Sequence, residues 1–245
     1  MGVNIPTGKD SLSMTQKYGD RQVHSPGTVI ITAAGEVENF RKAVSPALKK
    51  KSGSKLVYID FSGDDFHLGG AFAQVLGQTG NRVPKVKNVP LFIQTFDAVQ
   101  QLIKEGKILA GHDVSAGGLI TTLLEMCFPH NGMGMKLTLE NLTPDIFSLF
   151  SEKPAIVIQV NDLSDISFLK SKGIAATEIG ETASGDIFSA GEHQFSVSAL
   201  REKWFHASYL LDEKQRPTHA KRRKENIFKQ ELSYQFPTHF IGKRP

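Results

Sequence analysis

The stretch KILAGHDVSAGGLITTLLEMCF (Lys107–Phe128) holds a short strand pattern that passes directly into a helix pattern. Its first five residues, Lys107–Gly111, form an apolar run typical of a buried strand. From about Ser115 to Phe128 the apolar residues recur at helical spacing instead. A strand that leads straight into a helix is a building unit of layered α/β folds, so this stretch predicts the fold class.

Further strands and helices alternate on both sides of this stretch. Strands are predicted at Thr28–Gly35, Lys55–Phe61, Met135–Glu140 and Ala155–Val160, and three shorter ones, as a small antiparallel set, at 176–183, 186–191 and 194–198. Helices are predicted at 90–107, 162–173 and 197–215. Four large residues of the last helix are assigned to the core: Trp204, Phe205, Leu210 and Leu211. This order predicts an α/β (α+β) domain, a sheet layered with helices, over residues 28–213.

The composition is that of a globular protein without a membrane span. Of the 245 residues, 40% are hydrophobic and 22% are charged, which is ordinary for a folded domain. No run approaches 18 uncharged apolar residues, and no signal-peptide core follows Met1. The chain is therefore predicted to be soluble and cytoplasmic, with no membrane partner. The single cysteine, Cys127, excludes an internal disulfide and is interpreted as a buried, inert thiol.

The two ends of the chain differ from its middle. Residues 1–27 contain a loop and no complete element, as expected for the remnant of a preceding domain. Residues 214–245 are basic, and between Lys214 and Lys229 seven basic residues accompany one acid. Such a tail could contact nucleic acid. No aromatic stacking set accompanies it, so a solvated connector is favoured and no nucleic-acid partner is predicted.

The turn inside Lys107–Phe128 carries the first candidate site. Asp113 lies beside a helix start whose glycines, Gly117 among them, leave backbone N–H groups free for an anion. A carboxylate next to bound phosphate suits Mg²⁺. N-capping by Ser115 and tight strand–helix packing explain the same residues without a ligand, so both interpretations stay open. His112 could act as a base, although a hydrogen-bonded structural role is favoured.

The loop NIPTGKDSLSM (Asn4–Met14) carries the second candidate site. Its central residues offer close backbone access, a phosphate-pairing cation, a candidate metal ligand and a hydroxyl, in the order Gly8, Lys9, Asp10 and Ser11. It is not a P-loop, because Asp10 follows the lysine where that motif has Ser or Thr. A polar turn introduced by Pro6 and Gly8 explains the same residues, and this alternative also stays open.

Five motifs follow one another along the chain: GVNIPTGKDSLSM, LGGAFAQ, AGHDVSAGGL, LFSEKPAIVIQV and LREKWFHASYLLDEKQ. Together they resemble the phosphoribosylformylglycinamidine synthase family, and most closely the second half of the synthetase region in its large single-chain form. That family belongs to the aminoimidazole ribonucleotide synthetase superfamily. The resemblance covers nearly all of the chain, and its most specific part is the pairing of PTGKDSLSM with GHDVSAGGL.

The resemblance implies both a fold and a reaction. The fold is an α/β domain with a ferredoxin-like core. Residues 1–27 are the remnant of a preceding barrel-type domain, and residues 214–245 are a basic connector that leads toward a glutaminase domain. The reaction is the ATP-dependent conversion of formylglycinamide ribonucleotide to its amidine with glutamine-derived ammonia. The implied partners are the first synthetase half, the barrel domains and the glutaminase domain of the same polypeptide, with the nucleotide and ribonucleotide as small-molecule ligands.

The resemblance also gives the candidate residues roles. Gly8–Ser11 matches a loop that meets ATP and substrate phosphate at the catalytic site. Asp113 matches a Mg²⁺ ligand, and Ser115 and Gly117 match nucleotide-binding positions of an auxiliary ATP/ADP site. Ala116 departs from the pattern, because many relatives carry a second Asp there. No catalytic set is complete in this chain, so it is expected to be inactive alone; the alternatives are a scaffold half that binds no nucleotide and a nucleic-acid-binding module.

Overall fold

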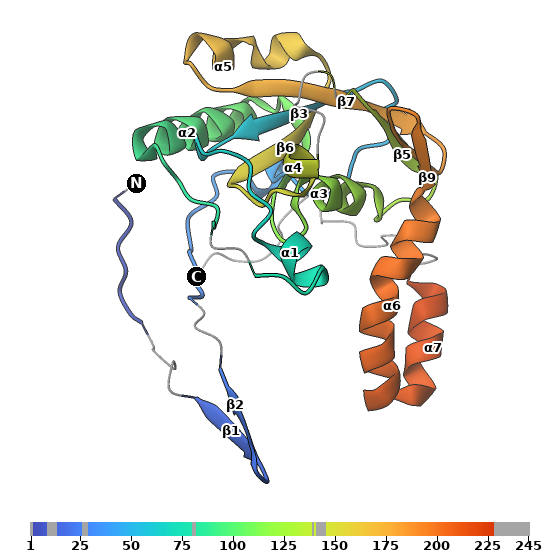
Figure 1. The fold of residues 1–245 in the computed structure, drawn as a ribbon. Helices are drawn as coiled ribbons and strands as arrows, with labels where there is room; N and C mark the ends of the chain where they lie inside the picture. Colours follow the sequence, from blue (N-terminus) through green and yellow to red (C-terminus); the bar gives the residue numbers. More distant parts are fainter. Residues whose placement is uncertain are drawn as a thin grey trace, which may run out of the picture. The chain divides into compact units, whose positions relative to one another are not determined.

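The computed structural model describes residues 2–8, 14–25, 29–79, 82–138, 140 and 146–227 (Figure 1). The chain divides into two units, Met1–Arg41 and Lys42–Pro245. In the first unit, β1 (Thr15–Tyr18) pairs with β2 (Arg21–His24) as an antiparallel hairpin. Gly19 has a φ of 58° in the two-residue turn, a conformation that glycine adopts without strain.

The strand predicted at Thr28–Gly35 is wrong for its described part. Residues 29–37 have no regular secondary structure, and the side chains of Val29, Ile30 and Ile31 are 82–85% exposed. The apolar run favours a strand, but a strand also needs a neighbour to take its backbone hydrogen bonds. Among the described residues, no strand pairs with this segment.

A seven-stranded sheet forms the centre of the second unit. Its strands are β3 (Lys55–Asp60), β4 (Ile108–Asp113), β5 (Met133–Leu137), β6 (Ala155–Val160), β7 (Ala176–Ser184), β8 (Ile187–Ala190) and β9 (His193–Ser196). They lie in the order β4-β6-β3-β7-β5-β8-β9, and the β5–β8 pair alone is parallel. The last three strands are therefore not the separate antiparallel set that the sequence predicts, because β7 lies in the middle of this sheet.

Four of the strands form the predicted ferredoxin-like core. The chain runs β3, α2 (Val89–Glu105), β4, then β6, α5 (Ser167–Ser171) and β7, and these strands lie antiparallel in the order β4-β6-β3-β7. This is the β-α-β-β-α-β arrangement, with α3 (Gly118–Cys127) and β5 inserted between its halves. The short helices are η1 (Phe40–Lys42), α1 (Ala71–Val75), α4 (Ile146–Phe150) and η3 (Leu163–Ile166).

Helices cover both faces of the sheet because the side chains of β3 alternate. Val57 and Ile59 pack with α2 and α5 on one face, and Leu56 and Tyr58 pack with α3 on the other. Cys127 lies buried in the α3 layer, and burial raises the pKa of its thiol to about 12, as expected for an inert cysteine. The layered α/β class predicted from the sequence is confirmed.

Two antiparallel helices, α6 (Val197–Gln215) and α7 (Pro217–Asn226), extend from the sheet as a hairpin (Figure 1). Arg201 joins α6 to the core, since its guanidinium donates to the carbonyl oxygen of Phe128 at 3.1 Å. The core assignment for α6 is wrong for three residues that are exposed: Trp204, Leu210 and Leu211. Among the described residues, the start of α6 packs into the core through Val197 and Leu200.

Part of the predicted basic connector is helical. Pro217 begins α7, a position where its missing N–H costs no hydrogen bond. Two cations of α7 pair with acids of α6, Arg223 with Asp212 and Lys224 with Glu202. These cations are therefore engaged within the hairpin. No helix among the described residues is long and apolar enough to span a membrane.

Candidate functional site at the ends of β3 and β4

The candidate site lies where two strands end beside the start of a third. Both β3 and β4 run antiparallel to β6, so their C-terminal ends meet its N-terminal end. Asp60 pairs with Ala155 in the sheet register, and Asp113 pairs with Ile156. The loops that follow β3 and β4 therefore leave the sheet next to the turn that leads into β6.

Three consecutive side chains of that turn hold the loop after β3. Ser151 Oγ accepts the N–H of His67 at 3.1 Å, and Glu152 Oε1 accepts the N–H of Ala71 at 2.7 Å. Lys153 Nζ donates to Asp60 Oδ2 at 2.8 Å and to the carbonyl oxygen of Asp64 at 2.9 Å. The turn 151–153, which the sequence shows only as a polar connection, thus holds residues 60–71 at several points.

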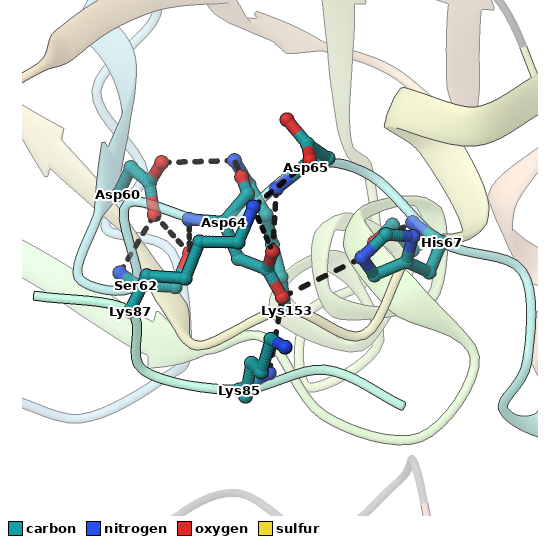
Figure 2. Close-up of polar contacts among 9 residues, drawn as sticks. Asp60, Ser62, Asp64, Asp65, His67, Lys85, Lys87 and Lys153 are labelled. Atoms are coloured by element: carbon teal, nitrogen blue, oxygen red, sulfur yellow. Dashed lines mark hydrogen bonds and ion pairs between the residues drawn. The ribbon is translucent and has the colours of Figure 1, made fainter. Parts of the chain in front are cut away.

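Polar residues around the end of β3 form what we call the Asp64 cluster, drawn in Figure 2: Asp60, Ser62, Asp64, Asp65, His67, Lys85, Lys87 and Lys153. The carboxylate of Asp64 is 0% exposed and lies 2.8 Å from Lys87 Nζ. It also accepts the N–H of Asp65 at 2.9 Å and lies 3.5 Å from His67 Nε2. The hydrogen bond from Lys87 holds the pKa of Asp64 far below its usual range.

Asp60 is the second acid of the cluster. Burial by itself would raise the pKa of Asp60, but hydrogen bonds from Lys153 and Ser62 outweigh burial and lower it. Ser62 contributes through both its N–H, at 2.8 Å, and its hydroxyl, at 2.7 Å. Lys153 also lies 4.1 Å from the ring centre of Phe66. Asp60 and Asp64 are thus both paired within the cluster, which fixes the loop.

Asp113, in contrast to Asp64, has an exposed carboxylate. Its side chain is 74% exposed, and its Oδ1 lies 3.2 Å from His112 Nδ1. His112 Nε2 lies 3.0 Å from Glu125 Oε2 on α3, which supports the structural interpretation of this histidine. Within the described parts of the chain, no three His, Cys, Asp or Glu side chains gather as a metal cluster. Asp113 fits Mg²⁺ as a single carboxylate ligand beside water and phosphate, a set that Mg²⁺ accepts.

The predicted helix start at Ser115 is three residues too early. Helix α3 begins at Gly118 after Gly117, whose φ is 89°, and no side chain caps it. Ser115 is exposed, and its carbonyl oxygen accepts the N–H of Gly118 at 3.0 Å. Gly117 and not Ser115 is the N-cap residue, so the N-cap explanation of Ser115 is wrong.

The backbone N–H of Gly117 is not free for an external anion. It donates to Glu152 Oε1 at 2.9 Å, so a carboxylate of the chain already lies where the sequence predicts an anion. Gly118 is needed for packing, since a Cβ there would lie 2.5 Å from the carbonyl carbon of Phe150. Close packing therefore accounts for Gly118, although its neighbour is helix α4 and not a strand, and Asp113 and Ser115 remain available to a ligand.

The predicted phosphate loop is only partly described. Gly8 is exposed and lies outside any helix or strand. Lys9, Asp10 and Ser11 lie outside the described residues. The role of this loop stays a prediction.

Sequence reasoning missed Glu152, Lys153 and the Asp64 cluster. A usable signal was present: IDFSGDDFH (residues 59–67) places three carboxylates directly after a buried strand, and SEK (residues 151–153) stands directly before another. Charges at the ends of neighbouring strands meet in space. The pairing of β3 with β6 is what joins them, and nothing local in the sequence specifies that pairing.

Comparisons with known proteins agree with this architecture. Residues 51–193 match the family described as AIR synthase related protein, C-terminal domain. The chain is 35% identical over 227 residues to the probable phosphoribosylformylglycinamidine synthase, chloroplastic/mitochondrial, of Arabidopsis thaliana, which covers 88% of this chain and 16% of that protein. It is 33% identical over 231 residues to human phosphoribosylformylglycinamidine synthase, covering 86% of this chain and 17% of that protein. The chain thus spans about one sixth of the length of these relatives.

Solved structures show the same fold at low identity. PurL of Thermotoga maritima complexed with FGAR matches with a TM-score of 0.52 at 15% identity, over 66% of this chain and 30% of that one. The same protein complexed with ATP matches with a TM-score of 0.51 at 14% identity, over 66% and 28%. Because the family match covers more than half of the chain and includes β3 to β8, the chain belongs to the AIR synthase related protein, C-terminal domain family.

Proposed function

We propose that this chain is the C-terminal AIR-synthase-type domain of a phosphoribosylformylglycinamidine synthase, a ligase of purine biosynthesis with glutamine as its amide donor. The observation that carries the proposal is 33–36% identity to proteins of that name from Arabidopsis thaliana, Homo sapiens and Caenorhabditis elegans, over 79–88% of the chain. The shared fold with a Thermotoga maritima PurL solved with FGAR and with ATP supports it.

The proposed reaction belongs to the whole protein. There, ATP drives conversion of formylglycinamide ribonucleotide to its amidine with ammonia from glutamine. The first synthetase half, the barrel domains and the glutaminase domain of the same polypeptide are the proposed partners, with residues 1–27 in the preceding barrel-type domain, 28–213 in this domain and 214–245 leading toward the glutaminase. The location is proposed to be cytoplasmic, and the chain alone is expected to form no amidine.

We assign the auxiliary nucleotide site to the turn after β4. Asp113 is the proposed Mg²⁺ ligand, and water and nucleotide phosphate would complete the metal's six ligands. Bound Mg²⁺ would neutralise phosphate charge there. The exposed hydroxyl of Ser115 is the proposed contact to ATP or ADP. Gly117 contributes through its left-handed backbone, because its N–H is bonded to Glu152.

The loop Gly8–Ser11 is assigned to the catalytic site, where Lys9 would pair with phosphate. In the whole enzyme, Lys9→Ala is expected to lower kcat/KM by about 10²-fold, the scale of removing one well-placed electrostatic donor. Lys17→Ala, in the exposed strand β1, is the matched control and should leave kcat/KM unchanged. Near wild-type kinetics for Lys9→Ala would show that the loop is only a turn.

One observation favours a second candidate, a scaffold half that binds no nucleotide. Glu152 occupies the Gly117 N–H that an anion would otherwise use. Thermal unfolding of the chain separates the two candidates. A nucleotide site predicts a Tm that rises when ADP is added with Mg²⁺, and a scaffold predicts no shift.

A further inference from the structure

One carboxylate joins the starts of α1 and α3. Oε1 of Glu152 accepts the N–H of Ala71 at 2.7 Å and the N–H of Gly117 at 2.9 Å. These donors are 81 and 35 residues away from Glu152 along the chain. The side chain therefore ties the end of the loop after β3 to the turn after β4.

Backbone groups, not a cation, hold the charge of Glu152. The N–H of Gly117 lies at the N-terminal end of α3, where the partial charge is positive, and the N–H of Ala71 begins the short helix α1. Within the described residues Glu152 forms no ion pair, and its neighbour Lys153 is directed to Asp60 instead. Hydrogen bonds to an ionised acceptor are about twice as strong as neutral ones, so this contact depends on the charge.

Glycines allow the carboxylate to fit. A Cβ on Gly70 would lie 2.1 Å from Glu152 Oε2, so that turn can approach only because Gly70 has no side chain. Gly117 needs glycine for its φ of 89°. The two turns and the carboxylate therefore form one fitted contact, and its geometry fixes the direction in which the turn 113–118 leaves β4.

We propose that Glu152 is a positioning residue of the auxiliary nucleotide site. It anchors Gly117 against the Gly70–Ala71 turn and so holds Asp113 and Ser115 in one arrangement before nucleotide binds. A turn that is already ordered loses less conformational entropy on binding, which strengthens affinity. This inference rests on the proposed function, since the ligand is the nucleotide assigned there. Glu152 acts through the Gly117 N–H and does not itself contact the nucleotide.

Two variants of the full chain separate the effect of the Glu152 charge from the effect of its side-chain length. Glu152→Gln keeps the length and an acceptor oxygen but removes the charge, and Glu152→Asp keeps the charge but is one methylene shorter. Each is expected to weaken Mg·ADP binding about tenfold by calorimetry, the scale of a charged hydrogen bond. Glu181→Gln removes an equal charge from the ion pair with Lys55, at the other end of β3, and should leave the dissociation constant unchanged.

Amide hydrogen exchange supplies a readout that does not need nucleotide. In Glu152→Gln, the amides of Ala71 and Gly117 should exchange about tenfold faster, because each loses its charged acceptor. The amides of β6 should keep their protection. A residue that only stabilises the fold would instead raise exchange throughout the sheet and lower the Tm.

The outcomes decide between the proposals. Tighter Mg·ADP binding by Glu152→Gln would overturn the positioning role, because it would show that the carboxylate competes with phosphate. Faster exchange at Gly117 with unchanged affinity would overturn it as well, since loop order would then not matter for binding. Unchanged exchange at both amides would refute the tether alone. Failure of the wild-type chain to bind Mg·ADP would refute the proposed nucleotide site, and with it any role of Glu152 in binding, whatever the exchange result.

Discussion

Asp64 lies in the loop after β3 and Asp113 is the last residue of β4, yet the carboxylates at these two strand ends differ in exposure and in their partners. Asp64 is completely buried, with Lys87, His67 and backbone N–H groups around it. Asp113 is largely exposed, with His112 beside one oxygen. A carboxylate whose oxygens are all engaged can only hold a loop, whereas one with open lone pairs can bind a ligand. Position at the end of a strand therefore does not decide whether an acid is engaged by the fold or open to a ligand.

The side chain of Asp113 is exposed, but the backbone of the turn that follows it is tightly packed at Gly118. Gly118→Ala should destabilise the fold by about 4 kcal/mol, because a left-handed residue gains a Cβ that overlaps the Phe150 backbone. Gly132→Ala is the control, with a φ of 71° and no atom within 4 Å of the added Cβ, and should cost about 1 kcal/mol. Equal costs in urea unfolding would show that the turn has room to move.

Substitution of Lys153 tests whether the Asp64 cluster stabilises the fold. Lys153→Met removes a buried cation and leaves Asp60 without its ion pair, so we expect a loss of about 3 kcal/mol in the free energy of unfolding. Lys55→Met removes a more exposed lysine from its pairs with Glu178 and Glu181, and should cost less than about 1 kcal/mol. A Lys153→Met chain as stable as Lys55→Met would contradict a structural role for the cluster.

The sequence predicted the central elements well. Strand β6 begins and ends where its apolar run does, and helix α6 covers the predicted range. These elements follow from local periodicity and caps: Ser196, for example, accepts the N–H of Ala199 at the start of α6. The predicted position of Asp113 between a strand and a helix also holds, since it ends β4, but its role as a Mg²⁺ ligand stays a prediction.

What the sequence could not predict depends on contacts between distant residues. Glu152 and Lys153 matter because of partners 35 to 93 residues away. The start of α3 was misplaced because the serine favours a cap, while two left-handed glycines and packing against Phe150 set the actual start. The strand predicted at Thr28–Gly35 is wrong over its described residues for the same reason, since strand formation depends on a partner that periodicity does not reveal.

The pH dependence of stability should come from the buried acids of the Asp64 cluster. The pKa values of Asp60 and Asp64 are lowered in the folded chain, so the unfolded chain binds more protons near an ordinary aspartate pKa of about 3.9. Their stabilisation is complete above about pH 5 and is lost as the pH falls through the folded pKa values. Asp64→Asn should reduce the proton uptake on unfolding by up to about one proton in this range.

Urea unfolding from pH 7 down to pH 3 gives the free energy of unfolding at each pH. The slope of this free energy against pH measures the proton uptake on unfolding. The wild-type curve should fall more steeply than that of Asp64→Asn below pH 5. Parallel curves would show that the Lys87–Asp64 pair does not contribute in the way its burial indicates.

Asp113 should give the smallest change in stability and a clear change in binding. Asp113→Asn alters an exposed side chain, so the free energy of unfolding should shift by no more than about 0.5 kcal/mol. An amide is a poor Mg²⁺ ligand compared with a carboxylate, so ADP affinity measured with Mg²⁺ should fall while affinity measured in EDTA stays the same. Asp65→Asn is the matched control, because Asp65 is equally exposed but belongs to the loop after β3. If Asp113→Asn keeps the full Mg²⁺ dependence, the open carboxylate is not a metal ligand, and exposure alone does not distinguish the functional acid from the structural one.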